Sequence, residues 1–192
     1  MNPSDYFKKI SDLLIKAEAT DRKGTRLNLG DAFQAALQVI MEENKKIMVI
    51  GNGGSAAIAS HVHNDLCHAC GLQAMVFNDS SQLTALSNDH GYQHVFEIPI
   101  DLWASRGDLL IAISSSGKSE NILRGAKAAQ VKGCEVITLS GFSSDNPLRQ
   151  LGNINFYVAS NNYGEVEISH MSIVHYLTDC AMKLRTKSTN YE

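Results

Sequence analysis

Long apolar runs are missing from this chain of 192 residues. No segment approaches the roughly 18 consecutive apolar residues that suggest a membrane-spanning helix. The opening MNPSDYFKKISDLL lacks the basic start, apolar stretch and small-residue cleavage site of a secretion signal. We therefore expect no membrane partner and a cytoplasmic location.

The chain also carries little net charge. Its 17 Lys and Arg residues against 20 Asp and Glu leave a formal charge of −3, which gives no general attraction to nucleic acid. Any bound anion must therefore be held by a local site. Hydrophobic residues make up 44% and charged residues 19%, an ordinary balance for one globular domain over residues 1–192.

Cysteine is scarce, with Cys67, Cys70, Cys134 and Cys180 as the only examples. Cys67 and Cys70 form a C-x-x-C, which could serve redox chemistry or half of a zinc site. A second C-x-x-C is absent, and Cys134 and Cys180 lie in apolar patterns where cysteine packs as a small hydrophobe. We favour a structural role for all four.

Apolar spacing divides the chain near residue 45. Residues 6–20 and 29–44 repeat apolar side chains at helical spacing, so we expect N-terminal helices within 1–45 and a loop over 21–28. An α/β core over 46–186 should follow, because short buried-strand patterns there alternate with helical ones. The predicted strands are 46–50, 73–77, 108–113, 134–139 and 154–158, and the predicted helices are 55–67, 80–88, 119–132 and 166–184.

Strands that alternate with helices predict an α/β fold with a doubly wound, five-stranded parallel sheet. Ligands of such sheets bind beyond the carboxyl ends of the strands. The loops that follow Ile50, Phe77 and Ile113 are therefore the places to look for chemistry.

The first of these loops is Gly51-Asn52-Gly53-Gly54-Ser55, between a predicted strand and a predicted helix. Glycines let backbone N–H groups approach an anion, and the helix N-terminus offers unpaired donors. A tight turn without a ligand explains this loop equally well. The spacing matches neither the P-loop nor the dinucleotide fingerprint.

The second loop contains four hydroxyls and a glycine, Ser114-Ser115-Ser116-Gly117-Lys118-Ser119, and it also joins a strand to a helix. Hydroxyls and backbone amides at a helix N-terminus form a neutral cage for a phosphate monoester. Two such loops in one sheet favour a phosphate site over ordinary turns.

Together these motifs carry a family resemblance. GNGGS after one strand and ISSSGKSEN after a later one resemble the pattern of sugar-isomerase (SIS) domains, and residues 85–92 resemble the S-N-D-x-G-[FY] stretch of sedoheptulose-7-phosphate isomerases. The resemblance covers residues 30–185 and implies an aldose–ketose isomerase, an intramolecular oxidoreductase, that moves a proton through an enediol. It also implies a homotetramer. The substrate-binding residues it implies are Asn52, Gly53, Ser55, Asp79, Ser114, Ser115, Ser116, Ser119 and Glu167.

Four further side chains could supply acid, base or metal ligands. His61 and Asp65 lie four residues apart on one predicted helix face, and Glu167 and His175 lie eight apart on roughly one side of another. Imidazoles and carboxylates suit zinc, although each histidine alone could equally be a hydrogen-bonded structural residue. The resemblance implies that Asp65 and His175 are the catalytic pair and that all four can hold zinc.

The sequence departs from the heptose isomerases at four positions. Asp65 stands where the family has Glu, Glu167 where it has Gln, Ala69 near its Arg and Gly164 in place of its Asp. Two alternatives therefore stay open: an isomerase of a different sugar phosphate, and a sensor that binds phosphosugars without turnover.

Overall fold

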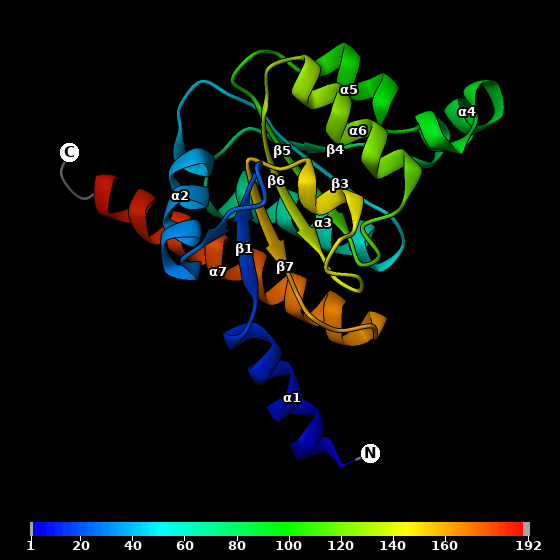
Figure 1. The fold of residues 1–192 in the computed structure, drawn as a ribbon. Coiled ribbons are helices and arrows are strands. Elements are labelled where there is room, and N and C mark those ends of the chain that lie inside the picture. The colour runs from blue at the N-terminus through cyan, green and yellow to red at the C-terminus, as the bar shows by residue number, and fades with distance from the viewer. Residues whose placement is uncertain (1, 190–192) are drawn as a thin grey trace.

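The computed structural model describes residues 2–189, with side chains up to residue 185. Helices and strands alternate along most of this range (Figure 1). Its α-helices are α1 (Pro3–Ile15), α2 (Leu29–Met41), α3 (Gly54–Asn64), α4 (Ser80–His90), α5 (Glu97–Trp103), α6 (Glu120–Val131) and α7 (Tyr163–Thr189). Short π or 3-10 turns occur at η1 (Asp65–Ala69), η2 (Tyr92–His94) and η3 (Pro147–Gln150).

One mixed sheet lies at the centre, in the order β2-β1-β7-β6-β5-β3-β4. The five strands from β7 to β4 are mutually parallel, and they correspond to the five that the apolar runs predict. The strands are β1 (Glu18–Asp21), β2 (Arg26–Leu27), β3 (Ile47–Gly51), β4 (Ala74–Val76), β5 (Leu109–Ser114), β6 (Glu135–Ser140) and β7 (Ile154–Tyr157).

The prediction of a purely parallel five-stranded sheet is wrong at one edge. α1 ends at Ile15 rather than near residue 20, and β1 pairs antiparallel with β7 while β2 pairs with β1. The Asp21 carboxylate closes this hairpin by accepting hydrogen bonds from the backbone N–H groups of Lys23 and Thr25. The strands are short and polar, so their stability comes from pairing with β7 rather than from a local pattern.

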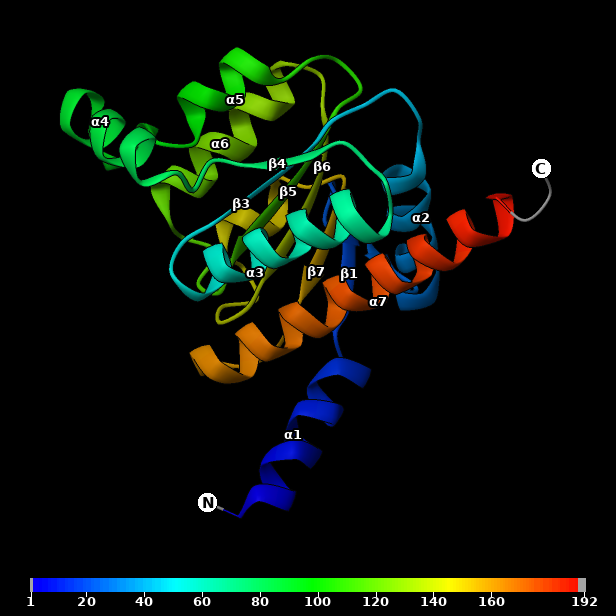
Figure 2. The ribbon, with the colours of Figure 1, turned by 180° about the vertical axis from the view of Figure 1, so that it is seen from behind.

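Helices cover both faces of the sheet (Figures 1 and 2). α2, α3 and α7 lie on one face, and α5 and α6 lie on the other. Side chains of successive strand residues point to opposite faces of the sheet. Val49 packs in the hydrophobic core under α2, α3 and α7, whereas Met48 and Ile50 pack in the core under α5 and α6. Burial on both faces explains why these strands are continuously apolar.

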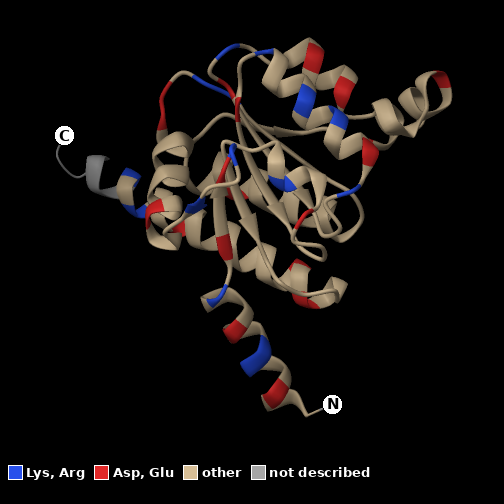
Figure 3. Cartoon of the chain, viewed as in Figure 1, with Lys and Arg blue, Asp and Glu red and all other residues tan. Residues whose placement is uncertain are grey.

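Helix α1 projects away from the sheet (Figure 2). Lys9 on this helix forms a 2.6 Å ion pair with the buried Glu165 carboxylate near the start of α7. Phe7 and Ile15 are largely exposed. Acidic and basic residues are interspersed along α1 (Figure 3). None of the helices in the described part of the chain is long and apolar enough to cross a membrane.

Candidate active site

The two loops predicted from sequence meet at one cavity. β3 and β5 are neighbouring parallel strands that end at Gly51 and Ser114, so the loops after them leave the sheet side by side. Between them lies a cavity of about 220 Å³, which we call the serine cavity. Its lining residues are Asn52, Gly53, Gly54, Ser55, Ser114, Ser115, Ser116, Ser119, Tyr163 and Glu167.

Two glycines shape the first loop. Gly53 has a φ of 52°, a left-handed conformation that side chains disfavour. A Cβ at Gly54 would lie 2.4 Å from the Glu167 carboxylate, so the Glu167 side chain reaches the loop backbone here and would have to move for a larger residue. The loop leads directly into α3, whose N-terminal amides face the same region.

The serine hydroxyls differ in how far they are engaged within the loop. Ser114 donates to Ser119 Oγ at 3.5 Å, and Ser114 and Ser116 accept hydrogen bonds from the backbone N–H groups of Gly117 and Lys118. Ser119 occupies the N-cap of α6 but makes no capping hydrogen bond. The Ser115 hydroxyl is buried and lacks a hydrogen-bond partner among the described residues. A buried unpaired hydroxyl costs about 1–3 kcal/mol, which a ligand oxygen would offset. With the N-termini of α3 and α6, the cavity offers neutral donors to an anion.

Asp79 does not line the serine cavity, and its predicted role near the sugar stays a prediction. It is the N-cap of α4, and its side chain accepts hydrogen bonds from the backbone N–H groups of Ser81 and Gln82. A hydrogen bond from the Ser81 hydroxyl is the largest cause that lowers the pKa of this carboxyl. Asp79 therefore has a local structural role within one chain.

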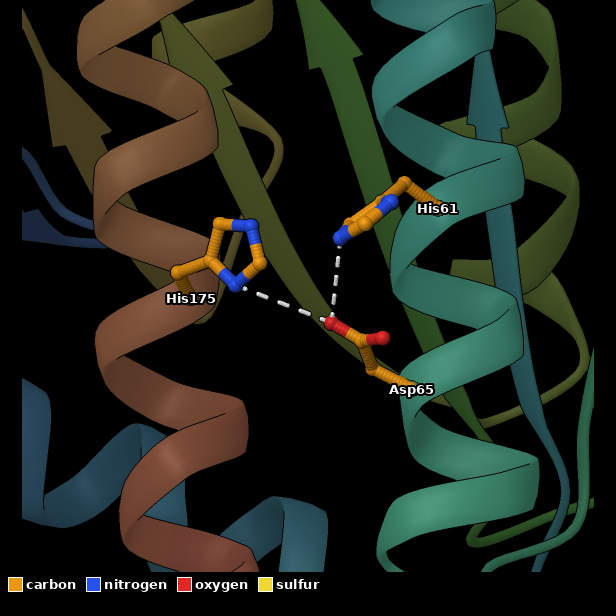
Figure 4. Close-up of side chains that lie close together, drawn as sticks. All are labelled: His61, Asp65 and His175. Carbon is orange, nitrogen blue, oxygen red and sulfur yellow. Dashed lines mark ion pairs between the residues drawn. The ribbon is translucent and has the colours of Figure 1, made fainter.

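A second group of side chains joins α3 to α7 (Figure 4). Asp65 Oδ2 lies 3.3 Å from His61 Nε2 and 3.6 Å from His175 Nδ1. The two imidazole rings meet edge to face, with centroids 4.7 Å apart. We call these three residues the histidine–aspartate cluster.

Asp65 begins the π-helical turn η1, which follows α3 directly. Single π turns inside α-helices are rare and are frequent at functional sites. The cluster stays accessible, since the side chains of His61 and His175 are 45% and 43% exposed. Solvent or a ligand can therefore reach it.

The cluster fits a metal ion. One ligand atom from each of His61, Asp65 and His175 lies within 4.8 Å of the other two. Two imidazole nitrogens and a carboxylate oxygen suit zinc, and three protein ligands leave a fourth position open. The geometry equally suits ion pairs between Asp65 and protonated histidines.

Glu167 is not a member of the cluster, so the predicted set of four metal ligands loses one within this chain. Its carboxylate lines the serine cavity against Gly54. Eight residues separate it from His175 on α7, and a rise of 1.5 Å per residue makes that about 12 Å along the helix axis. Sharing one side of a helix does not bring side chains together over more than two turns.

Comparison with known proteins agrees with this arrangement. The SIS domain family model matches residues 5–141. The phosphoheptose isomerase of Aliarcobacter butzleri is 37% identical over 153 residues, which cover 77% of this chain and 80% of the relative. The chain belongs to the SIS domain family, and within it to the phosphoheptose isomerases.

Solved structures of the family have the same fold. The phosphoheptose isomerase of Neisseria gonorrhoeae superposes with a TM-score of 0.77 at 29% identity, covering 93% of this chain and 96% of the other. That of Francisella tularensis gives 0.80 at 28% identity, covering 94% and 96%. Nearly the whole described chain therefore takes part in the family fold.

Two residues at or near the site, Tyr163 and His170, are not among the predicted site residues. Tyr163 lines the serine cavity, and its ring packs edge to face on Phe142. His170, one turn after Glu167, is completely buried and its Nε2 lies 3.1 Å from the Ser140 carbonyl oxygen. Burial lowers the pKa of His170 to about 4, so this ring stays neutral at physiological pH.

The four cysteines are free thiols. Burial raises the pKa of Cys134 to about 11 and also raises the pKa of Cys70, whose Sγ donates to the Thr178 carbonyl. Thiolate chemistry is disfavoured at both. This agrees with structural cysteines rather than a redox pair.

Proposed function

We propose that this chain is an aldose–ketose isomerase that converts sedoheptulose 7-phosphate, or a closely related sugar phosphate, into the corresponding aldose phosphate. Membership of the phosphoheptose isomerases supports the reaction class. The observation that carries the assignment is that a cavity lined by serine hydroxyls and an acid/base cluster lie along the same two helices, α3 and α7.

In this proposal the serine cavity binds the phosphate. Ser55, Ser114, Ser116 and Ser119 donate hydroxyl hydrogen bonds, and backbone amides around Asn52 and Gly53 add to them. Ser115 and Glu167 then face the sugar next to the phosphate. Binding at the non-reacting end supplies energy for orienting the carbonyl end.

The spacing along α3 suits a long sugar chain. Ser55 and His61 are six residues apart, which is about 9 Å of helix axis. An extended seven-carbon chain with a terminal phosphate spans on the order of 10 Å, taking C–C bonds of about 1.5 Å. A heptose phosphate held at the serine cavity can therefore bring its carbonyl carbons to the histidine–aspartate cluster.

Asp65 and His175 are the proposed acid/base pair. In the conversion of a ketose, a base removes a proton from C1 and an acid protonates the carbonyl oxygen at C2, giving an enediol. Return of a proton to C2 and loss of the proton on the C1 oxygen complete the aldose. Such positioned proton transfers contribute about 10²–10⁴-fold in rate. The open faces of both side chains make room for the substrate.

His61, Asp65 and His175 would hold a zinc ion, if one binds. Zinc supplies Lewis-acid polarisation of a carbonyl oxygen. Asp65 and His175 serve in both assignments, so metal content and the effect of a chelator on turnover separate them. Full activity of metal-free protein would leave Asp65 and His175 as the acid/base pair alone.

We also propose a homotetramer. Exposed apolar side chains support association, since Phe7 and Ile15 on α1 are 68% and 73% exposed. Ile15 also lines an apolar hollow, together with Leu14, Phe33, Ser172, Ile173 and Tyr176. Light scattering coupled to gel filtration measures the assembled mass, and a monomer at micromolar concentration would contradict this proposal.

The deciding experiment is turnover in deuterated water. Purified protein is incubated with sedoheptulose 7-phosphate, and the products are followed by NMR. An enediol route predicts an aldose phosphate that carries solvent deuterium at C2. A panel of five- to seven-carbon ketose phosphates tests whether the departures at Asp65 and Glu167 change the preferred substrate. Absence of turnover across the panel would contradict the proposed function.

A further inference from the structure

Two amide side chains join the loops on either side of the serine cavity. Asn52 and Asn121 each donate Nδ2–H to the Oδ1 of the other, and both distances are 2.9 Å. Asn52 belongs to the loop after β3 and lines the cavity, whereas Asn121 lies in the first turn of α6, after the serine loop. The reciprocal pair therefore ties together the two chain segments that form the cage.

Further hydrogen bonds fix the orientation of both amides. The Tyr92 hydroxyl donates to Asn52 Oδ1 at 2.9 Å, and the Ile122 backbone N–H donates to Asn121 Oδ1 at 3.0 Å. Asn121 is only 3% exposed, so water is a poor substitute for a lost partner. Rotating either amide would leave donors facing donors, which is costly in a buried network.

We propose that Asn121 is a positioning residue that holds the Gly51–Ser55 loop in its ligand-binding geometry through Asn52. The inference rests on the proposed function, because it concerns the same phosphate site. The loop contains Gly53 and Gly54, which give it a large conformational entropy to lose on binding. Fixing it before the ligand arrives removes that cost from the binding step. Asn121 does not line the cavity, so it acts through its partner.

The first test removes the amide pair. We expect Asn121→Ala to weaken binding of inorganic phosphate about tenfold in calorimetry, because two hydrogen bonds that order the loop are lost. The KM for sedoheptulose 7-phosphate should rise by a similar factor, while kcat changes less than about threefold. Lys127→Gln, at an exposed position of α6, is the matched control and should leave all three values unchanged.

A double-mutant cycle separates positioning from general destabilisation. Tyr92→Phe removes one hydrogen bond to Asn52 from a half-exposed side chain, so the variant should fold even if Asn121→Ala does not. We expect Tyr92→Phe to weaken phosphate binding about threefold alone and hardly at all in the Asn121→Ala background. Thermal unfolding of each variant shows whether affinity simply follows stability.

The outcomes distinguish this inference from the proposed function. Unchanged phosphate affinity in both variants, or fully additive effects in the cycle, would overturn the role of Asn121. If the unaltered protein binds phosphate but converts no sugar phosphate, the isomerase assignment fails and the cycle still decides the inference. If the unaltered protein binds no phosphate, both the proposed function and the role of Asn121 are contradicted.

Discussion

The serine cavity and the histidine–aspartate cluster lie along the same helices, α3 and α7, but they are built differently. The cavity is formed by loop backbone, hydroxyls and two helix N-termini, and positions such as Ser55 and Ser115 are buried. The cluster consists of three titratable side chains on helix surfaces, each partly exposed. The first arrangement offers uncharged donors to an anion, with the Glu167 carboxylate on one wall, and the second suits proton transfer or metal binding.

This difference predicts that substitutions in the two regions affect different constants. A cluster substitution should lower kcat and leave phosphate affinity intact. A cavity substitution should mainly raise KM and weaken phosphate binding, and it should lower kcat far less than a cluster substitution does, because the bound phosphate is remote from the reacting carbons.

The largest effects should come from the cluster. We expect Asp65→Asn and His175→Gln each to lower kcat by about 10²–10⁴-fold, since each removes a proposed proton-transfer group. Calorimetry should find the same Kd for inorganic phosphate as in the unaltered protein. His68→Gln, which changes an exposed histidine on the same π turn as Asp65, is the matched control. Normal kcat in both cluster variants would remove these residues from the mechanism.

The next largest effect is on stability and comes from the buried His170 on α7. The folded pKa of His170 is about 4 and its ordinary value is 6.5, so between these pH values the unfolded chain binds a proton that the folded chain does not. The free energy of unfolding should therefore fall as pH drops through this window, by up to about 3 kcal/mol.

Urea unfolding at several pH values measures this contribution. In His170→Gln the extra pH dependence between 6.5 and 4 should disappear, even if the variant is less stable throughout. The His170 ring contacts the Ser140 carbonyl oxygen, and the next residue, Gly141, donates its backbone N–H to the Ser115 carbonyl. Protonation of His170 should therefore also loosen the serine loop. If the free energy of unfolding depends on pH in the same way in the unaltered protein and in His170→Gln, His170 is not the group responsible.

A smaller effect is expected from Ser119→Ala. Removing one hydroxyl donor to a phosphate dianion should raise KM about tenfold, the lower end for a hydrogen bond to a charged group. Stability should hardly change, because Ser119 makes no capping hydrogen bond although it occupies an N-cap. Steady-state kinetics and thermal unfolding on the same preparation check both halves. A large loss of stability would show that the hydroxyl serves the helix instead.

Some secondary-structure elements can be predicted from the sequence and others cannot. The five parallel strands are buried on both faces, so each reads as an apolar run, and the loops after β3 and β5 carry distinctive glycines and serines. The hairpin of β1 and β2 leaves no such trace, because pairing with β7 creates it. Helix α5 was also missed, since seven residues around Pro99 give too short a pattern.

The candidate site shows the same limit. Spacing alone predicts that His61 and Asp65 share a helix face, because they are one turn apart. The packing of α7 on α3 decides that His175 joins them and that Glu167 lies at Gly54 instead. Asn121 stands at the end of the ISSSGKSEN motif, but its partner Asn52 is far away in sequence and becomes visible only in the fold.

The smallest effect on activity is expected from substitution of Asp79, which can be compared with Ser119 because both residues are helix N-caps. Asp79 and Ser119 both stand at helix N-caps, but Asp79 accepts two backbone hydrogen bonds at the start of α4 while Ser119 accepts none. We expect Asp79→Ala to lower the melting temperature with no change in KM or in phosphate Kd, the reverse of Ser119→Ala. A raised KM with unchanged stability would instead support the substrate role that the family resemblance implies for Asp79.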